Sequence, residues 1–558
     1  MLKKGILTVA IVFFATQLFA QFNVAGGQVH GNYQIDFQTY QKDSEIGIND
    51  LNGKKTGMNG FGNIIYTNGK FSAGLRYETY LPPLNGYENQ YEGHGIAHKY
   101  LKYTGEMFEI TAGNFYEQFG NGLVFRSYEE WSLGFDNAMN GVLVKVKPVP
   151  GIILKGVYGT QRHYWNKYEN QNRGIVKGID GEISLNETFS SLNDMKTRIV
   201  LGGSFVSKYE KDNPFFAYKL PENVGAYAAR LNINHGKWAL QSEYARKIND
   251  PNSINNFIYK DGEALWLSAS YSQRGLGVIV SGKRIDNFSF TSIRSPKEGK
   301  APTINFLPPL AYQHTYSLLA LYPYSTQPNG EIGFSAEVFY NMPKKSLLGG
   351  KYGTKISLNY SRIHGLDKEK VADTININQI GTDGYTSEFF KLGDVKFYED
   401  ISVKINKKVS RNFKFIAGYS YQDYNFDVVN ENIEDGKTMY RSHMGFLDMT
   451  FKLDRKKSLR TELQYLATKQ DSGHWALAMV EYSVAPHWFF TAQDQVNFNN
   501  PQSDNIYHYY MFGVAYVHKA TRLAVSYGRT REGVLCVGGV CRQVPASSGL
   551  TLTLTSNF

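Results

Sequence analysis

The chain has two cysteines, Cys536 and Cys541, with Gly538-Gly539 at the centre of the four residues between them. A Gly-Gly pair between β-prone residues predicts a two-residue hairpin turn, which would set the cysteines directly opposite each other. At a non-hydrogen-bonded position, such a pair comes close enough for a disulfide after a small twist, and a secreted chain meets an oxidising environment. We therefore expect a cross-strand disulfide that rigidifies the tip of the last hairpin, on the extracellular side. Two free thiols or a metal site are the alternatives, although two cysteines without a nearby histidine are poor zinc ligands.

Three arginines, Arg529, Arg531 and Arg542, lie close to this turn in the sequence. They could line a constriction or bind a carboxylate or phosphate, or they could be ordinary lumen or loop cations. Signs of an enzyme are weak, because the sequence has no HExxH, no phosphate-binding Gly-rich loop and no GxSxG. His94 and His98 are four residues apart but lie beside glycines rather than in a convincing helix. We expect no catalytic residue, no cofactor and no metal.

The segment from Gly113 to Gly141 is the densest in unusual residues. Long loops of a β-barrel can fold inward and narrow the pore, and Gly120 and Gly122 would permit the bend. A plain outer loop is the alternative. The side chains predicted to enter the lumen with this loop are Glu117, Arg126, Tyr128, Glu129 and Asp136.

Most of the chain has a hydrophobic period of two, which is the period of a β-strand. In the first predicted strand, residues 29–37, apolar side chains alternate with polar ones such as Gln34 and Asp36, and a face this polar suits a wet lumen better than a dry core. Arg230 and Glu243 are predicted to lie diagonally across one hairpin and to form an ion pair. The predicted lumen-lining residues are Arg76, Glu78, Lys145, Lys147, Lys155, Arg230, Glu243 and Arg529.

The pattern of turns and strands predicts the fold. After residue 20 no apolar run is long enough for a spanning helix, whereas Asn68-Gly69 and His235-Gly236 predict two-residue hairpins. Short turns alternate with long polar segments, as they do in outer-membrane barrels. We predict an all-β fold, a transmembrane antiparallel up-and-down β-barrel. Roughly 25 segments resemble strands, and because such barrels have an even number we expect about 22–26 strands, with the error between residues 285 and 330, where prolines blur the pattern.

Both ends of the chain carry signals. A short positive start followed by an apolar run predicts a signal peptide over residues 1–20, cleaved after Ala20. Residues 21–558 then form a single outer-membrane β-barrel domain, because no linker interrupts the strand pattern. In the final predicted strand, leucines alternate with threonines up to the terminal Phe558, the kind of strand that the outer-membrane assembly machinery reads in many barrels.

Three stretches, Gly113–Tyr128, Arg173–Glu182 and Cys536–Ala546, make the chain resemble an uncharacterised family of Bacteroidota outer-membrane proteins. The resemblance implies a large porin-like barrel in the cell outer membrane. It carries over no functional residue, because the family has no settled biochemical role.

These features favour a porin-like channel for a hydrophilic solute or polymer. The net charge of +10 and a positive lumen wall formed by Lys145, Lys147 and Lys155 would favour an anionic one. The alternative is a structural barrel subunit of an envelope secretion or assembly complex, with a plugged lumen and outer loops as docking surfaces; a surface enzyme is a third hypothesis. The expected partners are outer-membrane lipid and lipopolysaccharide, the barrel-assembly machinery during biogenesis and, for the second hypothesis, envelope-complex proteins, but no nucleic acid.

Overall fold

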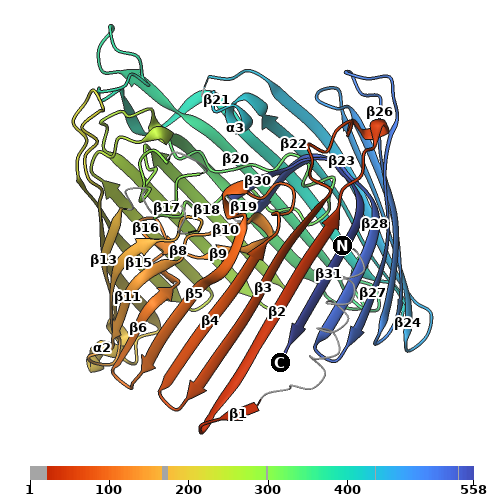
Figure 1. Cartoon of the computed structure of the whole chain (residues 1–558), viewed down its shortest axis with the longest axis horizontal. Coiled ribbons are helices and arrows are strands. Elements are labelled where there is room, and N and C mark those ends of the chain that lie inside the picture. Colours follow the sequence, from red (N-terminus) through yellow and green to blue (C-terminus); the bar gives the residue numbers. More distant parts are fainter. Residues whose placement is uncertain (1–21, 166–173, 297–299, 434, 538–539) are drawn as a thin grey trace.

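The computed structural model of the chain describes residues 22–165, 174–296, 300–433, 435–537 and 540–558. The predicted signal peptide and the predicted Gly538-Gly539 turn lie outside these ranges. Twenty-four antiparallel strands within the described residues close into one barrel (Figure 1). The all-β, up-and-down barrel predicted from the sequence is therefore confirmed. Across the same ranges, no helix combines the length and hydrophobicity that crossing a membrane requires.

The barrel strands follow each other around the wall in chain order. They are β2 (Gly27–Thr39), β3 (Thr56–Asn68), β4 (Phe71–Tyr80), β5 (Gly93–Thr104), β6 (Phe108–Phe115), β11 (Met139–Val146), β12 (Ile152–Gln161), β13 (Ile175–Ser184), β14 (Thr197–Tyr209), β15 (Asn223–His235), β16 (Trp238–Lys247), β17 (Gly262–Gln273), β18 (Leu276–Asp286), β19 (Gly330–Met342), β20 (Thr354–Lys370), β21 (Tyr385–Lys408), β22 (Phe413–Asn425), β23 (Met439–Lys452), β24 (Lys457–Thr468), β25 (His474–Val484), β26 (Trp488–Phe498), β27 (Tyr507–His518), β28 (Thr521–Thr530) and β31 (Ser547–Asn557).

The remaining elements are short. Strand β1 (Phe22–Val24) pairs with the start of β2. The small ribbons outside the wall are formed by β7 (Glu117–Gln118), β8 (Arg126–Ser127), β9 (Glu129–Glu130), β10 (Phe135–Asp136), β29 (Gly533–Val537) and β30 (Val540–Val544). The helices are α2 (Leu185–Thr188) and α3 (Phe426–Asn430), with single 3-10 turns at Ser44–Ile46, Asn89–Tyr91, Trp131–Leu133, Ser190–Leu192 and Ser253–Asn255.

The first and last barrel strands close the cylinder. Strand β31 pairs with both β28 and β2, so that Leu554 is opposite Ile35 and Thr553 is opposite Asp36. The hydroxyl of Thr553 donates a hydrogen bond to the carboxylate of Asp36 at 2.8 Å, which puts these polar side chains on one face and the leucines on the other. The predicted final amphipathic strand is thus the seam that closes the sheet.

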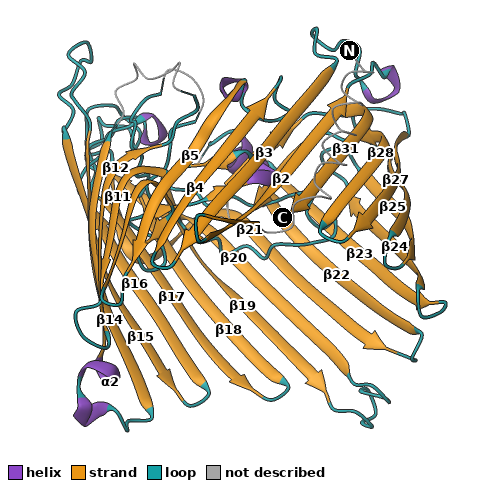
Figure 2. Ribbon diagram, turned by 60° about the horizontal axis from the view of Figure 1, so that its bottom comes forward, coloured by secondary structure: helices purple, strands orange, loops and turns teal. Residues whose placement is uncertain are grey.

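The two ends of the barrel differ in the length of their connections. The hairpins predicted at Asn68-Gly69 and His235-Gly236 join β3 to β4 and β15 to β16, but each turn lies one residue further on, because Asn68 pairs with Phe71 and His235 with Trp238. Gly69 and Gly236 have the positive φ, 56° and 58°, that tight hairpins need. This short-turn end also carries α2, which lies outside the lumen (Figure 2). Most connections at the opposite, long-loop end are longer, as the sequence predicted.

The error in the predicted strand count lies between residues 285 and 330, as expected, because the described residues between Asp286 and Gly330 form no strand of the wall. Strand β18 ends at Asp286, β19 begins directly opposite it at Gly330, and residues 287–329 leave the wall between them. The prolines of this stretch lack the N–H group that a ladder needs. Without this segment the number of barrel strands is even, at 24.

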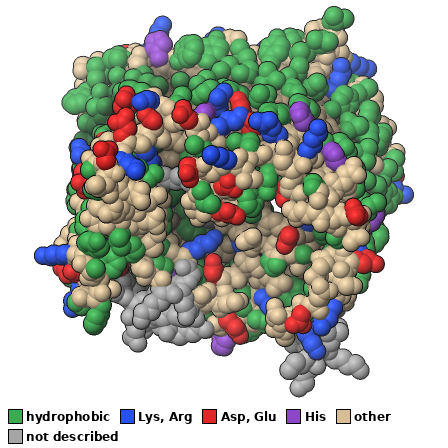
Figure 3. Space-filling view, turned by 90° about the horizontal axis from the view of Figure 1, so that it is seen from above, with side chains coloured by type: hydrophobic (Ala, Val, Ile, Leu, Met, Phe, Trp, Pro, Cys, Tyr) green, Lys and Arg blue, Asp and Glu red, His purple; other side chains and the backbone are tan. Residues whose placement is uncertain are grey.

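Burial on the wall is the reverse of burial in a soluble protein. Outward residues such as Leu75, Tyr158 and Trp238 are large, apolar and exposed, whereas inward residues such as Glu78 and Glu243 are charged and almost fully buried. A wall with lipid outside and a polar interior accounts for both. Seen from the long-loop end, charged side chains gather around the mouth, and hydrophobic ones line the outer edge (Figure 3).

Candidate functional site

Three segments fold from the long-loop end into the barrel, and together we call them the plug. The first inward segment, residues 116–138, connects β6 to β11, and the second inward segment, residues 287–329, connects β18 to β19. The capping hairpin, residues 531–546, connects β28 to β31 and contains β29 and β30. In each case the two flanking wall residues are direct register partners. Each segment is therefore an excursion from a continuous wall.

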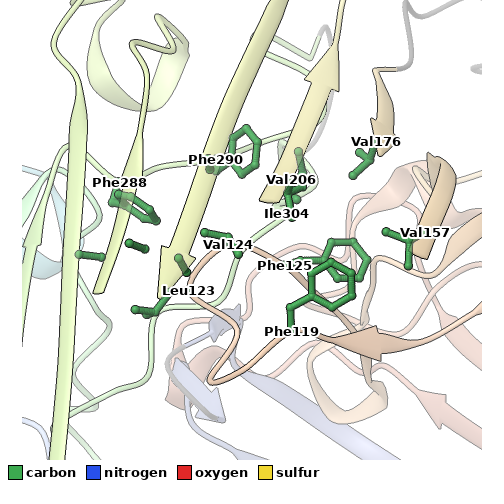
Figure 4. Close-up of a cluster of buried hydrophobic side chains, with 14 of the residues drawn as sticks. Phe119, Leu123, Val124, Phe125, Val157, Val176, Val206, Phe288, Phe290 and Ile304 are labelled. Atoms are coloured by element: carbon green, nitrogen blue, oxygen red, sulfur yellow. The ribbon is translucent and has the colours of Figure 1, made fainter. Parts of the chain in front are cut away.

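The tip of the first inward segment is docked by apolar packing. Phe119, Leu123, Val124 and Phe125 have no exposed surface and pack against the wall and the second inward segment (Figure 4). Full burial of four large apolar side chains is unusual for a barrel loop, so this tip is part of a core inside the lumen. The wall residues of this core include Val157, Val206, Ala226, Ala245 and Ala264.

The other half of the first inward segment is held by charge. Arg76 on β4, only 4 % exposed, forms ion pairs with Glu78 of its own strand at 2.8 Å and with Asp136 at 2.6 Å, and it also pairs with Glu129. Arg162, which follows β12, pairs with Asp136 and, at 2.7 Å, with Glu78. Burial would raise the pKa of Asp136, but the charges of Arg162 and Arg76 outweigh burial and hold that pKa below its usual value. Each buried charge is thus compensated, as burial requires.

Glu117 anchors the start of the first inward segment to lysines of the wall. Its carboxylate lies 2.6 Å from Nζ of Lys145 on β11 and 3.0 Å from Nζ of Lys155 on β12. Burial alone would raise the pKa of Glu117, but hydrogen bonds and charge from the two lysines outweigh burial and lower it. Lys147 takes no part in this arrangement, because β11 ends at Val146 and Lys147 is exposed in the following turn.

Arg230 on β15 and Glu243 on β16 both face inward, but they are directly opposed in register rather than diagonal. Arg230 forms ion pairs with Asp180 at 2.5 Å and with Glu182 at 3.0 Å, both on β13. Glu243 instead accepts hydrogen bonds from the backbone N–H of Asn121 at 2.6 Å and from its side-chain amide at 3.0 Å. One member of the predicted pair therefore stabilises the wall and the other holds the plug.

The two inward segments are joined to each other. The backbone N–H of Arg126 donates to the carbonyl oxygen of Ile304 at 2.8 Å, and the side chain of Asn137 donates to the backbone of the second segment at 2.8 Å. The Arg126 guanidinium lies between two rings, 4.2 Å from the centroid of Tyr128 and 4.0 Å from that of Phe306. Such cation–π contacts strengthen when they are removed from water, so the segments form one body.

The second inward segment crosses the lumen to β20–β25. Tyr316 stacks on Phe446 of β23, with ring centroids 3.9 Å apart. The N–H of Leu318 donates to the side chain of Gln464 on β24 at 2.9 Å, and Leu318 itself is fully buried in a second apolar cluster. This segment was missed from the sequence. Its apolar side chains are set among prolines, and that combination is the one signal that it is a packed loop.

The capping hairpin lies on the second inward segment. Cys536 and Cys541 form the disulfide predicted from their spacing and are direct partners in the β29–β30 ribbon. The side-chain amide of Gln313 donates to the carbonyl oxygen of Cys536 at 3.3 Å, and Nζ of Lys300 donates to that of Cys541 at 3.1 Å. Both donors belong to the second inward segment, so the disulfide-bonded ribbon covers that segment at the long-loop end.

Almost the whole chain, residues 2–558, matches the family described as a family of unknown function (DUF6029). The chain belongs to this family. No curated protein matches its sequence. Among solved structures, this DUF6029 chain is similar to the translocation pore of the P pilus usher PapC, at 10% identity over 95% of this chain and 99% of that chain, with a TM-score of 0.44. It is also similar to the siderophore receptor PirA from Pseudomonas aeruginosa, at 10% identity over 95% and 80%, TM-score 0.40, and to the copper transporter OprC, at 9% identity over 97% and 84%, TM-score 0.40.

Arg529 of this DUF6029 barrel does not line the lumen. It lies on the face of β28 that also carries the exposed Tyr527, and its guanidinium pairs with Asp43 at 2.6 Å and Glu45 at 2.6 Å in the loop after β2. The strand ends at Thr530, where the alternation that sets the inward face stops being informative. Over the residues with described positions, no group of three or more His, Cys, Asp or Glu side chains is arranged to hold a metal ion.

Proposed function

We propose that this chain is an outer-membrane channel for a hydrophilic solute or polymer and that the plug keeps it closed at rest. The observation that carries the proposal is that the plug does not pack equally against the whole wall. Its two large apolar clusters use inward residues of β11–β18 and of β20–β25, and a third, smaller one packs Trp131 on Phe61 and Tyr80 of β3 and β4. Most inward side chains on the rest of the lumen wall are small or polar.

The sector of the wall from β26 through β28 and β31 to β2 carries mostly small or polar inward side chains, many of them half-buried. Tyr509 and Met511 of β27 are among the large exceptions. Such a surface stays wettable whether the plug is docked or withdrawn, as the inner face of a water-filled barrel must. A path for a hydrophilic solute would run along this sector. Its inward residues include Gln34, Gln493, Ser526, Thr551 and Thr553.

The same geometry supports a preference for anions in the open state. Lys145 and Lys155 are neutralised by Glu117 while the plug is docked. If the first inward segment withdraws, its carboxylate leaves with it, and the two ammonium groups keep only longer contacts to wall carboxylates, Lys145 to Glu109 at 3.8 Å and Lys155 to Asp180 at 4.0 Å. A pore wall of one sign raises the local concentration of the opposite ion.

Conductance in planar bilayers tests this proposal on the full mature chain. Since Phe115 and Met139 are register partners, residues 117–137 can be replaced by a short Gly-Ser turn without opening the wall. The matched control replaces residues 371–384, whose flanking residues Lys370 and Tyr385 are also partners. We expect rare, brief openings for the native chain and the control, and steady anion-selective current for the plug variant. A folded variant that lacks residues 117–137 and 288–328 and still carries no current would refute the channel.

A structural subunit of an envelope complex is the second candidate, and the apolar docking of the plug favours it. Packing of Phe119 and Phe125 into the wall would keep the lumen shut permanently. In that case the native barrel should co-purify from mild detergent with a stoichiometric set of envelope proteins, and deletion of the plug should leave that set unchanged.

A further inference from the structure

A cleft of about 510 Å³ opens at the long-loop end, between two wall loops and the last residues of the capping hairpin. It is enclosed by three connections that are far apart in the sequence: the loop between β2 and β3, the loop between β4 and β5, and the residues that return from the capping hairpin to β31. Its size is typical of small-molecule sites. The cleft lies at the mouth, where a solute would first meet the barrel.

The lining of the cleft combines aromatic rings with amide side chains. Tyr40 and Tyr87 supply the rings, and the amides are those of Asn52, Asn85 and Asn89. The hydroxyl of Tyr40 accepts a hydrogen bond from the backbone N–H of Asn85 at 2.9 Å, which fixes one ring against the loop. Rings offer a flat apolar surface with a polar edge, and each amide offers both donors and an acceptor. This mixture matches a sugar ring, which has an apolar C–H face and hydroxyl groups around its edge.

Two cations add a preference for negative charge. Lys54 lines the cleft, with its ammonium 5.8 Å from the centroid of Tyr40. Arg542 of the capping hairpin lies 4.1 Å from the centroid of Tyr87. Within the part of the chain that the structure describes, neither has a carboxylate within ion-pair distance, and Nε and Nη1 of Arg542 are buried without a hydrogen-bond partner. Asp50, which also lines the cleft, is already paired with a lysine outside it, Lys42, at 3.5 Å.

We propose that this cleft binds an anionic saccharide, with the sugar against the partly exposed Tyr87 ring, the hydroxyls on the asparagine amides and the acidic group near Lys54. Arg542 is not itself a lining residue but contacts the Tyr87 ring from the capping hairpin. Burying Nε and Nη1 of Arg542 without hydrogen bonds costs free energy, and a carboxylate or phosphate that displaced the Tyr87 ring is the group that guanidinium best accommodates. The acidic group could belong to a free saccharide or to the saccharide of a lipopolysaccharide in the same leaflet.

The cleft is also in contact with the plug. The hydroxyl of Tyr87 donates to the backbone carbonyl of Trp131 at 2.7 Å, and the Trp131 ring stacks on Phe61 of the wall with centroids 4.3 Å apart. A ligand that moves Tyr87 would therefore act directly on the first inward segment. This contact extends the proposed function, but binding itself does not depend on whether the barrel conducts.

Isothermal titration calorimetry on the full chain in detergent tests the proposal with trigalacturonate as the acidic probe and maltotriose as the neutral one. We expect trigalacturonate to bind more tightly than maltotriose. Lys54→Gln and Arg542→Gln should each weaken the acidic probe by about tenfold, the size of one lost hydrogen bond to a charged group, and should leave maltotriose unchanged. The matched control is Arg411→Gln, an exposed arginine in a turn at the opposite end.

Two results would overturn the assignment: equal affinity of the native chain for both probes, or an affinity for trigalacturonate that neither substitution changes. Lys54 is on a surface loop, so its variant remains informative if Arg542→Gln fails to fold. Repeating the titration in nanodiscs with added lipopolysaccharide distinguishes the sources. If lipopolysaccharide is the ligand, it will compete with trigalacturonate and weaken its apparent binding; if the ligand is a free saccharide, added lipopolysaccharide will leave the titration unchanged. A negative titration beside an anion-conducting plug variant would reject this site and leave the channel intact.

Discussion

Replacing Arg76 by Gln should open the barrel without unfolding it. Arg76 is the wall residue that holds the charged half of the first inward segment, through Asp136 and Glu129. Its strand, β4, keeps its full backbone ladder with β3 and β5 after the substitution, because the side chain takes no part in it. The change therefore falls on the docking of the plug and not on the wall.

The size of the effect can be worked out from the partners that remain. Removing one member of a buried ion pair costs about 3–5 kcal/mol when the other is left uncompensated. Here Asp136 and Glu78 both keep their pairs with Arg162, and the side chain of Glu129, which is 30% exposed, can take up water. We therefore expect about 2 kcal/mol, close to one hydrogen bond to a charged group. If the plug is in a two-state equilibrium, that shift raises the ratio of open to closed barrels by about 30-fold.

Single-channel recording measures this ratio directly as the open probability. Arg411→Gln is the matched control, since Arg411 is an exposed arginine in the turn between β21 and β22, away from the lumen path. Adding Asp136→Asn to Arg76→Gln removes the charge left behind, so the double variant should open less than the sum of the single effects predicts. Unchanged open probability in Arg76→Gln, in a bilayer where the variant lacking residues 117–137 conducts, would show that these ion pairs do not hold the plug.

Three further predictions concern other parts of the plug. The Cys536–Cys541 disulfide closes only a short loop, so replacing both cysteines by serine should leave the thermal unfolding midpoint nearly unchanged. The double variant should be cleaved faster by protease in the capping hairpin; equal cleavage rates would show that the disulfide does not rigidify the hairpin. The pKa of Glu117 is lowered by Lys145 and Lys155, so its stabilisation is present above the ordinary glutamate pKa, about 4.3, and is lost as the pH falls through the lower folded value. Acid should therefore raise the open probability only below about pH 4, and Glu117→Gln should abolish that step. Phe119→Ala should cost the docked plug about 3–5 kcal/mol, measured as faster amide exchange in residues 117–125; native exchange rates would place this ring outside the docking core.

The wall could be predicted from the sequence because it depends on local rules. A strand shows its inward and outward faces by alternation, and a tight turn such as Asn68-Gly69 shows itself by the residues that tolerate positive φ. The same alternation placed Arg76, Glu78, Lys145 and Lys155 on the inner face. It failed at Arg529, which lies where its strand ends.

The plug could be predicted only in part, because its contacts join residues far apart in the chain. The glycines and charged residues of the first inward segment indicated a loop that folds inward. Nothing local indicates that Asp136 meets Arg76 or that Glu243 meets Asn121, since those pairings depend on how the closed barrel brings distant strands together. The sequence of the second inward segment resembled a strand interrupted by prolines. A single sequence does not distinguish apolar residues that pack inside a lumen from apolar residues that face lipid.

The two halves of the first inward segment are held by different forces, and under the proposed function this decides which half can move. The tip around Phe119 and Phe125 would expose large apolar surfaces if it left the wall, so its withdrawal is costly. Residues 126–138 are held by ion pairs to Arg76 and Arg162, by hydrogen bonds to the second inward segment and by one aromatic stack, Trp131 on Phe61. Water can replace the polar contacts once the groups separate, so less apolar surface is exposed than at the tip. A first opening would therefore need only this charged half to move, together with the capping hairpin, while the apolar tip and Glu117 stay docked. Release of Lys145 and Lys155 from Glu117 is a further step that needs the tip to leave the wall as well. The first of these motions would clear the lumen beside β2–β4, next to the wettable sector of the wall.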